Sequence, residues 1–139
     1  MQVSERRFPD DLLYDRHHQW LRIEEGELVI GVNDYLNATA GDFLYLHLPA
    51  VGQRVEPDEA LASVESGKWV GRIYSPVAGV VTGVNDRLPG KPSLLNQDPY
   101  GEGWLVRIRP AEEVAPERFL DSRAYAEFLR TELGREGTV

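Results

Sequence analysis

The chain has 139 residues, no cysteine and a formal net charge of −8. This length suits one domain with a real core, and the acidic balance argues against nucleic-acid binding, because phosphate contacts need clustered lysine and arginine. The missing cysteine excludes disulfides, thiolate zinc sites, iron–sulfur clusters and cysteine nucleophiles. We expect a single domain over residues 1–139, with its core at about 12–130 and a frayed tail at 134–139. A cytoplasmic location is expected, since neither a signal peptide nor a membrane-spanning run is visible.

The first half of the chain reads as short strands around one small helix. Strand-like segments at residues 20–23 and 28–32 flank a turn at 24–27 and predict a hairpin. The segment "NDYLNATAG" then predicts a helix that Asn33 or Asp34 caps and Gly41 ends.

The second half continues in strands and closes with a helix. Strand segments are expected at 42–49, 60–65, 69–76, 79–85 and 104–110, and residues 98–104 concentrate turn formers, which favours a structural loop. So many short strands avoid exposed edges best in a sandwich or flattened barrel. A final helix is expected at 121–134, where an apolar stripe would lie across the sheets. The stripe consists of Ala124, Tyr125, Phe128, Leu129 and Leu133.

The usual catalytic and metal-binding motifs are not met. The dipeptide at 67–68 invites a phosphate-loop interpretation, but Ala62 stands where the earlier glycine belongs and Trp69 replaces the magnesium-binding hydroxyl. No metal site is expected, because the adjacent His17 and His18 would face opposite sides of a strand. No catalytic residues are predicted, since no nucleophile, base and acid can be argued together from spacing. A protein that presents something, rather than an enzyme, is the better class.

Lys68 is the best candidate for the residue that is presented. A strand runs up to Glu65, a tight turn covers residues 66–69, and a second strand leaves at Val70, so the lysine stands at the hairpin tip. A flexible stem that ends in an amine is what a modifying ligase needs to reach, and a rigid hairpin holds it clear of the body. The pattern alone also fits an ordinary solvated lysine in a turn.

Five segments resemble a known family in their order and spacing. They are "HQW" at 18–20, "GVNDYLNATAGDFLYLHLPAVG" at 31–52, Glu65-Ser66-x-Lys68, "IYSPVAGVVTGVN" at 73–85 and "LLNQDPYGEGWLVRIRP" at 94–110. Together they are similar to the H protein of the glycine cleavage system, within the larger family of lipoyl and biotinyl carrier domains. The resemblance covers about residues 12–130. It implies that Lys68 carries lipoate through an amide.

The resemblance also implies a mainly β fold of the lipoyl-domain type. This is a hybrid-motif β-sandwich or flattened barrel with short flanking helices and a C-terminal helix. Residues 74–81 would form a strand that faces the lysine hairpin, with Gly79 marking a tight turn. Such a protein is a non-catalytic carrier whose swinging arm takes a bound intermediate and electrons from enzyme to enzyme. Because lipoate brings its own disulfide, the carrier needs no cysteine.

Residues around the attachment point are expected to serve the cofactor. Glu65 would help the ligase recognise the hairpin, or it is an ordinary charge at a strand end. Gly67 and Trp69 flank the lysine. The indole of Trp69 either packs against the sheet edge or forms an apolar platform for a partner or for the dithiolane ring.

Three arm-adjacent positions depart from the family pattern. Arg72 stands where the family has an acid, Gln19 replaces the glutamate of His-Glu-Trp, and His17 replaces a small polar residue. An aminomethyl adduct is cationic near neutral pH, so carboxylates would hold it and an arginine would repel it. A neutral or anionic cargo fits better. This favours the H-like lipoate-binding proteins of heterodisulfide-reductase-like sulfur oxidation, which the chain resembles at Gly-Lys-Trp-Val-Gly.

Alternatives stay open within and outside the carrier class. One is an H protein of glycine cleavage that carries the aminomethyl group, and another is an unmodified scaffold or relay protein. A biotinyl carrier is disfavoured, because those domains favour Met-Lys-Met at the tip. The expected partners are a lipoate ligase or lipoyl transferase and dihydrolipoamide dehydrogenase. The further partners are either heterodisulfide-reductase-like sulfur enzymes, or glycine decarboxylase together with aminomethyltransferase. No nucleic acid and no membrane is expected to bind.

Overall fold

Short strands make up most of the structure, which is a computed structural model that describes residues 2–3 and 6–137, with side chains as far as residue 134. The strands are β1 (Gln2–Val3), β2 (Arg6–Arg7), β3 (Leu13–Tyr14), β4 (Gln19–Glu24), β5 (Glu27–Val32), β6 (Phe43–His47), β7 (Arg54–Val55), β8 (Ala60–Ser66), β9 (Val70–Tyr74), β10 (Gly79–Val84) and β11 (Val106–Pro110). The helices are α1 (Asp34–Ala40), α2 (Leu94–Gln97) and α3 (Ser122–Gly137), with a 3-10 turn at Pro116–Arg118.

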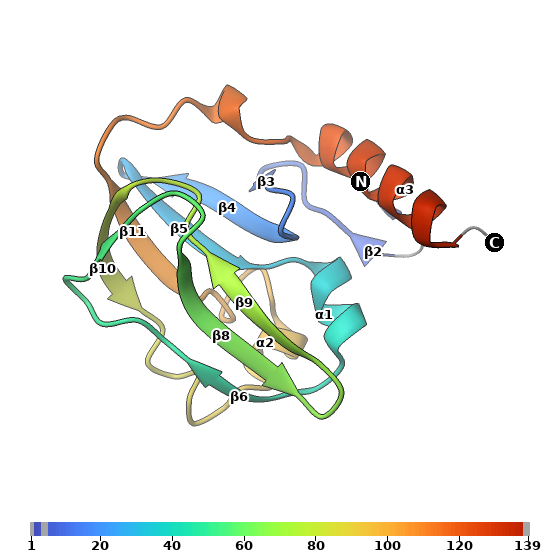
Figure 1. Cartoon of the computed structure of the whole chain (residues 1–139), viewed down its shortest axis with the longest axis horizontal. Coiled ribbons are helices and arrows are strands. Elements are labelled where there is room, and N and C mark those ends of the chain that lie inside the picture. The colour runs from blue at the N-terminus through green and yellow to red at the C-terminus, as the bar shows by residue number, and fades with distance from the viewer. Residues whose placement is uncertain (1, 4–5, 138–139) are drawn as a thin grey trace.

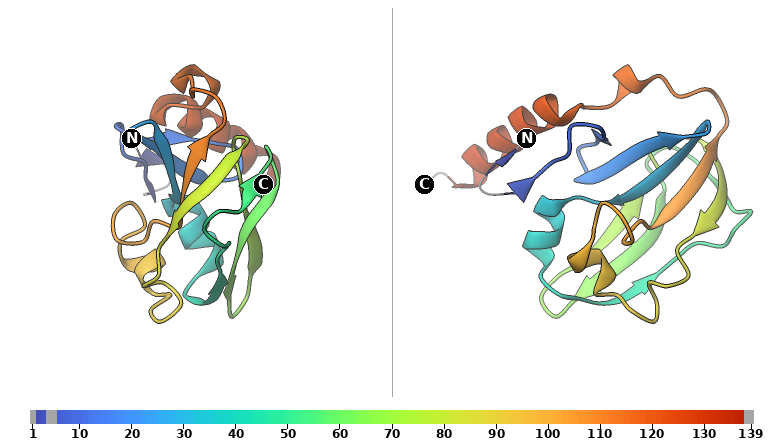
Figure 2. Two further views of the ribbon diagram at one scale, coloured as in Figure 1. Left: turned by 90° about the vertical axis from the view of Figure 1, so that its left-hand side faces the viewer. Right: turned by 180° about the vertical axis from the view of Figure 1, so that it is seen from behind.

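Two antiparallel sheets form the body of the protein. The larger has the order β3-β4-β5-β11-β10-β7 and the smaller the order β6-β8-β9, while β1 and β2 pair by themselves. Buried side chains from both sheets, among them Ile30, Val64, Ile73 and Ile108, belong to one hydrophobic core. Figure 1 shows the smaller sheet in front of the larger, and the views of Figure 2 show the layers from the side and from behind. The predicted mainly β sandwich with short helices is confirmed.

The predicted first hairpin and first helix follow from local chemistry. The hairpin of β4 and β5 turns through Glu25 and Gly26, both with positive φ (53° and 79°), as a type I′ turn requires. Asn33 caps α1, since its side chain accepts a hydrogen bond from the backbone N–H of Leu36 at 3.1 Å. Gly41 ends the helix with φ 81°, as predicted.

The C-terminal helix closes an aromatic cluster over the larger sheet. Tyr125 and Leu129 are fully buried there, with Phe8, Tyr14 and Trp20. Four members of the predicted stripe pack in this cluster, but Ala124 is exposed, because it lies on the opposite side of the first helical turn. The helix continues to residue 137, beyond the expected end at 134, and residues 138–139 of the expected tail lie outside the described residues.

Helix α3 is also the longest helix in the described part of the chain. No helix there combines the length and the apolar character needed to cross a membrane.

The predicted role of Gly79 is wrong in detail. The residue does not make a turn but begins β10, where it pairs with Pro110 on one side and Val55 on the other. A Cβ at this position would lie 2.3 Å from the backbone oxygen of Arg109. Glycine is therefore required here by the close approach of β11, and the chain reverses through the preceding residues 75–78.

Candidate functional site

The hairpin of β8 and β9 is anchored to the end of α1. The backbone N–H of Ser66 donates to the carbonyl of Trp69 at 2.8 Å, which closes the turn that the sequence predicts. The Ser66 hydroxyl donates to the carbonyl of Ala40 at 2.5 Å and accepts from the backbone N–H of Lys68 at 3.3 Å. One buried serine thus fixes the tip of the hairpin to the body, because it satisfies a carbonyl that the helix end leaves open.

Lys68 is exposed at this tip, as predicted. The chain has one other lysine, Lys91. None of the ion pairs among the described residues involves Lys68, and nothing lies within 4 Å of a Cβ placed on Gly67. The stem of Lys68 leans toward Gly41, where an added Cβ would lie 3.2 Å from Cε and 3.9 Å from Nζ. The amine is therefore accessible for acylation and rests beside the end of α1.

Trp69 packs back onto the hairpin. A Cβ on Gly71 would lie 1.9 Å from the indole, so the ring covers the position where a side chain would stand. The indole also meets the ring of Phe43 edge to face, with centroids 6.4 Å apart. Of the two interpretations of Trp69, this geometry fits packing against the sheet edge, although the side chain stays half exposed.

The outer face of the smaller sheet is open beside the lysine. Tyr45, Glu65 and Val70 lie in one row across the three strands, and Tyr45 and Val70 are 68% and 70% exposed. Exposed apolar side chains that are contiguous with a charged one are typical of interaction surfaces. The predicted recognition residue, Glu65, therefore stands between two exposed apolar side chains next to Lys68.

A stripe on β9 leads from the lysine toward His17. Because side chains two residues apart share a face of a strand, Arg72 and Tyr74 point to the same outer side. They lie two and four residues beyond Val70, which is about 7 Å and about 13 Å along the strand at about 3.3 Å per residue. The ring of His17 packs on that of Tyr74, with centroids 4.4 Å apart, and its Nε2 lies 3.7 Å from Asp58. The structure thus brings two of the predicted arm-adjacent residues, His17 and Arg72, to one side of the hairpin.

Gln19, the third predicted arm-adjacent residue, is buried. Its side chain is fully buried and joins the two sheets: Nε2 donates to the Tyr74 carbonyl and to Asp15, both at 2.9 Å, and Oε1 accepts from the Tyr74 backbone N–H at 2.8 Å. Burial raises the pKa of the Asp15 carboxyl to about 6, although hydrogen bonds from Gln19 and His17 oppose the rise. Gln19 therefore acts on the stripe through Tyr74, which it holds in place.

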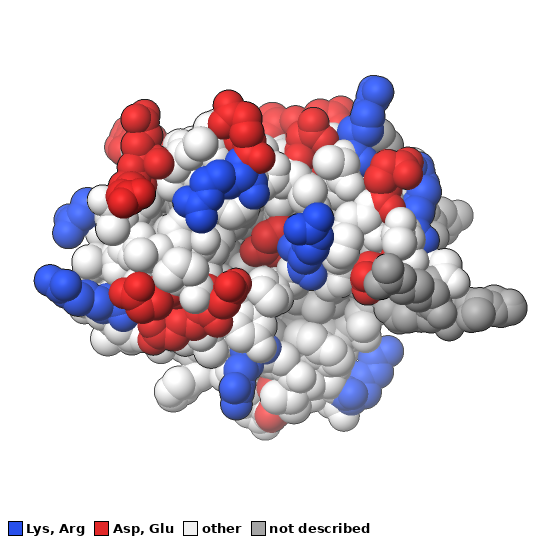
Figure 3. Space-filling view, turned by 45° about the horizontal axis from the view of Figure 1, so that its top comes forward, with Lys and Arg blue, Asp and Glu red and all other residues white. Residues whose placement is uncertain are grey.

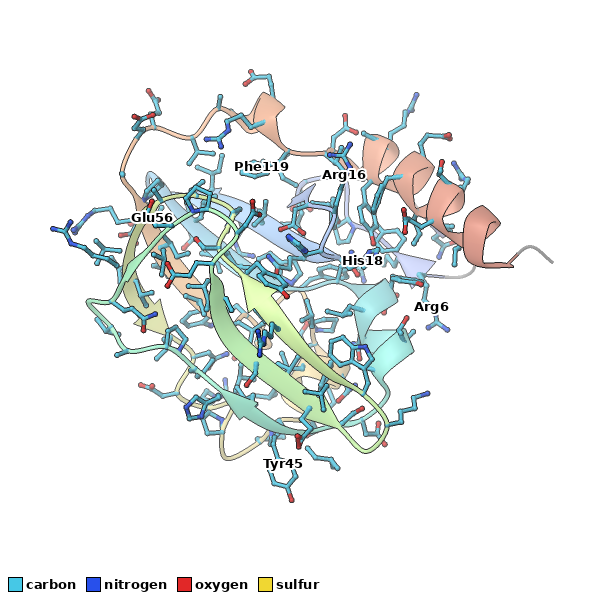
Figure 4. All side chains as sticks on the ribbon, viewed as in Figure 1. Arg6, Arg16, His18, Tyr45, Glu56 and Phe119 are labelled. Atoms are coloured by element: carbon cyan, nitrogen blue, oxygen red, sulfur yellow. The ribbon has the colours of Figure 1, made fainter. Side chains whose placement is uncertain are left out.

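A cleft of about 280 Å³ lies at the far end of the stripe. Its lining consists of Tyr14, Asp15, Arg16, His17, Asp58, Pro76, Arg118, Phe119 and Leu120. Figure 4 shows Arg16 and Phe119 on this side of the protein, above the strands. The sequence did not single out Tyr74 or Asp58. The period-two alternation after Val70 points to Tyr74, whereas nothing local points to Asp58, which meets His17 only through the fold.

His18 turns away from the stripe into the aromatic cluster. It adopts φ 63°, and its Nδ1 lies 2.6 Å from the hydroxyl of Tyr125, across 107 positions of sequence. The ring also packs against Tyr35 of α1, with centroids 4.7 Å apart. Burial lowers the pKa of His18 to about 4. The two adjacent histidines therefore face different surroundings, as predicted.

Acidic side chains are prominent on the surface. Figure 3 shows a contiguous acidic patch at one end of the face in view, with basic side chains scattered over the rest. The exposed segment 56–59 before β8 contributes three carboxylates to the surface. The patch supports docking onto basic partners, and it equally keeps the protein dissolved.

A β-sandwich that holds one exposed lysine at the tip of an anchored hairpin defines a carrier domain of the lipoyl type. The sequence comparisons specify the family. A sequence model of the family described as glycine cleavage H-protein matches residues 12–132, and the chain belongs to this family.

Individual relatives agree with this assignment. The chain is 42% identical over 125 residues to a glycine cleavage system H protein of Alkalilimnicola ehrlichii, and this match covers 89% of the chain and 96% of the relative. It is 43% identical over 124 residues to one of Thermus thermophilus, covering 89% and 97%. It is also similar to the crystal structure of a glycine cleavage system H protein from Mycobacterium marinum. That match has a TM-score of 0.79 and 28% identity, and it covers 88% of this chain and 98% of the other.

Membership in the glycine cleavage H-protein family bears on several of the expectations from the sequence. Proteins of this family carry lipoate covalently on a lysine and are carriers, not catalysts. The main expectation of a sulfur-oxidation protein is not supported, because the family model and these relatives carry the glycine cleavage name. The glycine cleavage alternative fits better.

Proposed function

We propose that this protein is a lipoyl carrier of glycine cleavage, with lipoate attached to Lys68. The observation that carries the proposal is the position of Lys68, exposed at the tip of a hairpin that Ser66 ties to the end of α1. The single domain over residues 1–139 and the cytoplasmic location expected from the sequence belong to the same proposal. An unmodified scaffold or relay protein is its alternative.

The chain's own residues fit the attached group. The Lys68 amine is exposed, has no ion-pair partner among the described side chains, and has an open approach past Gly67. When bound, lipoate supplies a disulfide and dithiol pair that holds electrons and, in glycine cleavage, an aminomethyl unit. The anchored hairpin keeps the attachment point in one place, and Glu65 with its exposed neighbours offers the ligase a surface beside the lysine.

The proposed partners act in turn on the same lysine. They are a lipoate ligase or lipoyl transferase, then glycine decarboxylase, aminomethyltransferase and dihydrolipoamide dehydrogenase. A tether keeps the effective concentration of its cargo high for each of them.

The test is the intact mass of the protein after incubation with lipoate, ATP and a lipoate ligase. The two lysines allow a matched pair of variants, Lys68→Arg and Lys91→Arg, which both keep the charge. We expect one lipoyl group on the native chain and on the Lys91 variant, and none on the Lys68 variant. A lipoyl group that persists in Lys68→Arg, or none on the native chain with any ligase, would favour the scaffold alternative.

Sulfur oxidation, with heterodisulfide-reductase-like enzymes as partners, is a second candidate because of Arg72. This cation is exposed on the outer face of β9, two residues beyond the start of the strand that leaves the lysine hairpin tip. There it disfavours a cationic cargo and favours a neutral or anionic one. Incubating the lipoylated protein with glycine decarboxylase and glycine separates the candidates. We expect an aminomethyl adduct in the mass spectrum, formed faster with Arg72→Asp. The absence of an adduct on both the native protein and the Arg72→Asp variant would favour the sulfur enzymes as partners.

A further inference from the structure

A tyrosine and a histidine share a short hydrogen bond inside the aromatic cluster. Nδ1 of His18 lies 2.6 Å from the hydroxyl oxygen of Tyr125, which is fully buried. Burial lowers the pKa of His18 to about 4, so the imidazole is neutral near pH 7 and has one nitrogen that accepts. The phenol O–H therefore donates to Nδ1, and a base lies within hydrogen-bond distance of its proton. Figure 4 places His18 between α1 and α3.

A second polar group, the amide of Asn33, acts on the same phenol oxygen. Among the described residues, Nδ2 of Asn33 is the one buried side-chain nitrogen or oxygen without a hydrogen-bond partner. Burial raises the pKa of Tyr125, and the side chain of Asn33 opposes this rise, because a donor stabilises an oxygen that has lost its proton. A buried donor without a partner needs an explanation. It has one if Nδ2 donates to Tyr125 only after the phenol proton has moved to His18.

Packed aromatic rings connect this pair to the surface. Tyr14 stacks on Tyr125 with ring centroids 5.1 Å apart, and Phe8 meets the same ring edge to face at 5.0 Å. The ring of His18 packs on that of Tyr35 at 4.7 Å, and Tyr35 is partly exposed. Electrons pass between aromatic rings over such distances. An oxidant that touches Tyr35 therefore has a path to Tyr125, although solvent does not reach the buried phenol.

We propose that Tyr125 and His18 form a proton-coupled redox site, at which one-electron oxidants such as peroxyl radicals produce a neutral tyrosyl radical. In this step one electron passes from the phenol to the oxidant, the O–H bond of Tyr125 breaks, and an N–H bond forms at Nδ1 of His18. The products are the tyrosyl radical, an imidazolium and the reduced oxidant. A one-electron reductant such as ascorbate restores the pair by the reverse route. The site does not involve Lys68, so it is independent of the proposed function.

The test generates a one-electron oxidant by light. The unmodified protein is mixed with tris(bipyridine)ruthenium(II) and a cobalt(III) ammine as electron acceptor, and a flash produces ruthenium(III). We expect a tyrosyl radical in EPR and transient absorption that outlives the radical of N-acetyltyrosinamide, because burial shields the oxygen. Tyr125→Phe keeps the packed ring and should abolish the long-lived signal. Tyr45→Phe, which removes a 68% exposed phenol, is the control that should retain it.

A histidine variant tests the proton transfer. Asparagine tolerates the φ of 63° at His18, but an amide is not a base. His18→Asn should therefore slow formation of the long-lived radical about a hundredfold, the low end of what a positioned proton acceptor contributes. His47→Asn, at an exposed histidine on β6, should leave the rate unchanged. Circular dichroism verifies that each variant is folded.

A pH profile of the native protein keeps the proposal testable if His18→Asn does not fold. His18 faces four other titratable groups, which are Tyr35, Tyr125, Glu132 and its neighbour His17. Burial sets the low pKa of His18, while Glu132 raises it and His17 lowers it to a smaller degree. An imidazolium accepts no proton, so the long-lived radical should form more slowly as the pH falls through about 4.

Three results would overturn the proposal. The first is that the native protein forms no long-lived tyrosyl radical, and the second is that this radical survives Tyr125→Phe. The third is that its rate of formation is unchanged in folded His18→Asn or, where that variant does not fold, across the pH profile. Because the unmodified protein is used throughout, none of these results bears on lipoate attachment.

Discussion

Two tryptophans lie over glycines in this protein, one in the larger sheet and one in the lysine hairpin. Trp20 of β4 covers its cross-strand partner Gly31 and is fully buried, with Nε1 donating to the carbonyl of Pro99 at 2.7 Å. Trp69 covers Gly71 two residues along the chain, but it is half exposed. The same packing device therefore locks the scaffold in one region, whereas in the other it steadies a tip that partners must approach.

The strongest way to break this comparison is to add a methyl group under each indole. A Cβ on Gly31 would lie 2.4 Å from the Trp20 ring, which has no space to move, so Gly31→Ala should lower the free energy of unfolding by about 3 kcal/mol. In Gly71→Ala the added methyl group meets the half-exposed Trp69 ring, which has room to turn toward solvent. The free energy of unfolding should therefore fall by about 1 kcal/mol or less. Urea unfolding measures both values. Equal losses would contradict the assignment of one rigid and one adjustable region.

The second prediction contrasts two departures from the family pattern. Gln19→Glu restores the family's residue, but it removes the amide that donates to Asp15 and the Tyr74 carbonyl and adds a buried charge. We expect a loss of about 2–3 kcal/mol at pH 7. The loss should shrink at pH 5, where protonation of either carboxyl supplies a donor. Arg72→Asp on the open face should stay within about 0.5 kcal/mol. Chemical denaturation at both pH values tests this, and an unchanged loss at pH 5 would be the contrary result.

The third prediction concerns acid and the aromatic cluster. The pKa of His18 is about 4 in the folded protein and 6.5 without burial, so the unfolded chain binds the proton first. The stabilisation by neutral His18 is present above pH 6.5 and lost toward pH 4. It amounts to about 2 kcal/mol, after a discount for partial exposure.

Asp15 opposes this loss. Its pKa is raised to about 6, so its contribution is present at low pH and lost as the pH rises through 6. His18→Asn, whose residue tolerates positive φ, should therefore lose less stability than the native protein between pH 6.5 and 4. Melting temperatures across this range provide the measurement. Parallel profiles for the two proteins would rule out His18 as the acid-sensitive group.

The smallest effect on stability is expected on the outer face of the hairpin. Val70→Asp should leave the unfolding free energy within about 0.5 kcal/mol, because the side chain is 70% exposed. It should nevertheless slow lipoylation about fivefold or more, as interface residues beside the reacting group do. Val51→Asp, at a 61% exposed valine outside the hairpin, is the control. A ligase that acts equally on both variants would show that this face is not its docking surface.

Features that depend on neighbours in sequence could be predicted. The turn at 66–69, the tip position of Lys68, the cap by Asn33 and the hairpin at 24–27 all follow from local residue chemistry. The family resemblance added the fold and the cofactor.

Features that depend on distant segments could not be predicted. Gln19 meets Tyr74 across 55 positions, and Ser66 meets Ala40 across 26. Alternation on a strand tells which residues share a face, but it does not tell which element covers that face. For that reason no sequence signal showed that Gln19, expected beside the arm, is buried and hydrogen-bonded to Tyr74.

The hydrogen bond from Ser66 to the end of α1 also sets a length scale. Because Ser66 holds the base of the arm in place, a group attached to Lys68 can reach no farther than the covalent length of the side chain plus its load. An enzyme whose reacting atoms lie deeper than that length must admit the hairpin itself. The depth of each partner's entrance therefore decides how much of the hairpin must enter together with the arm.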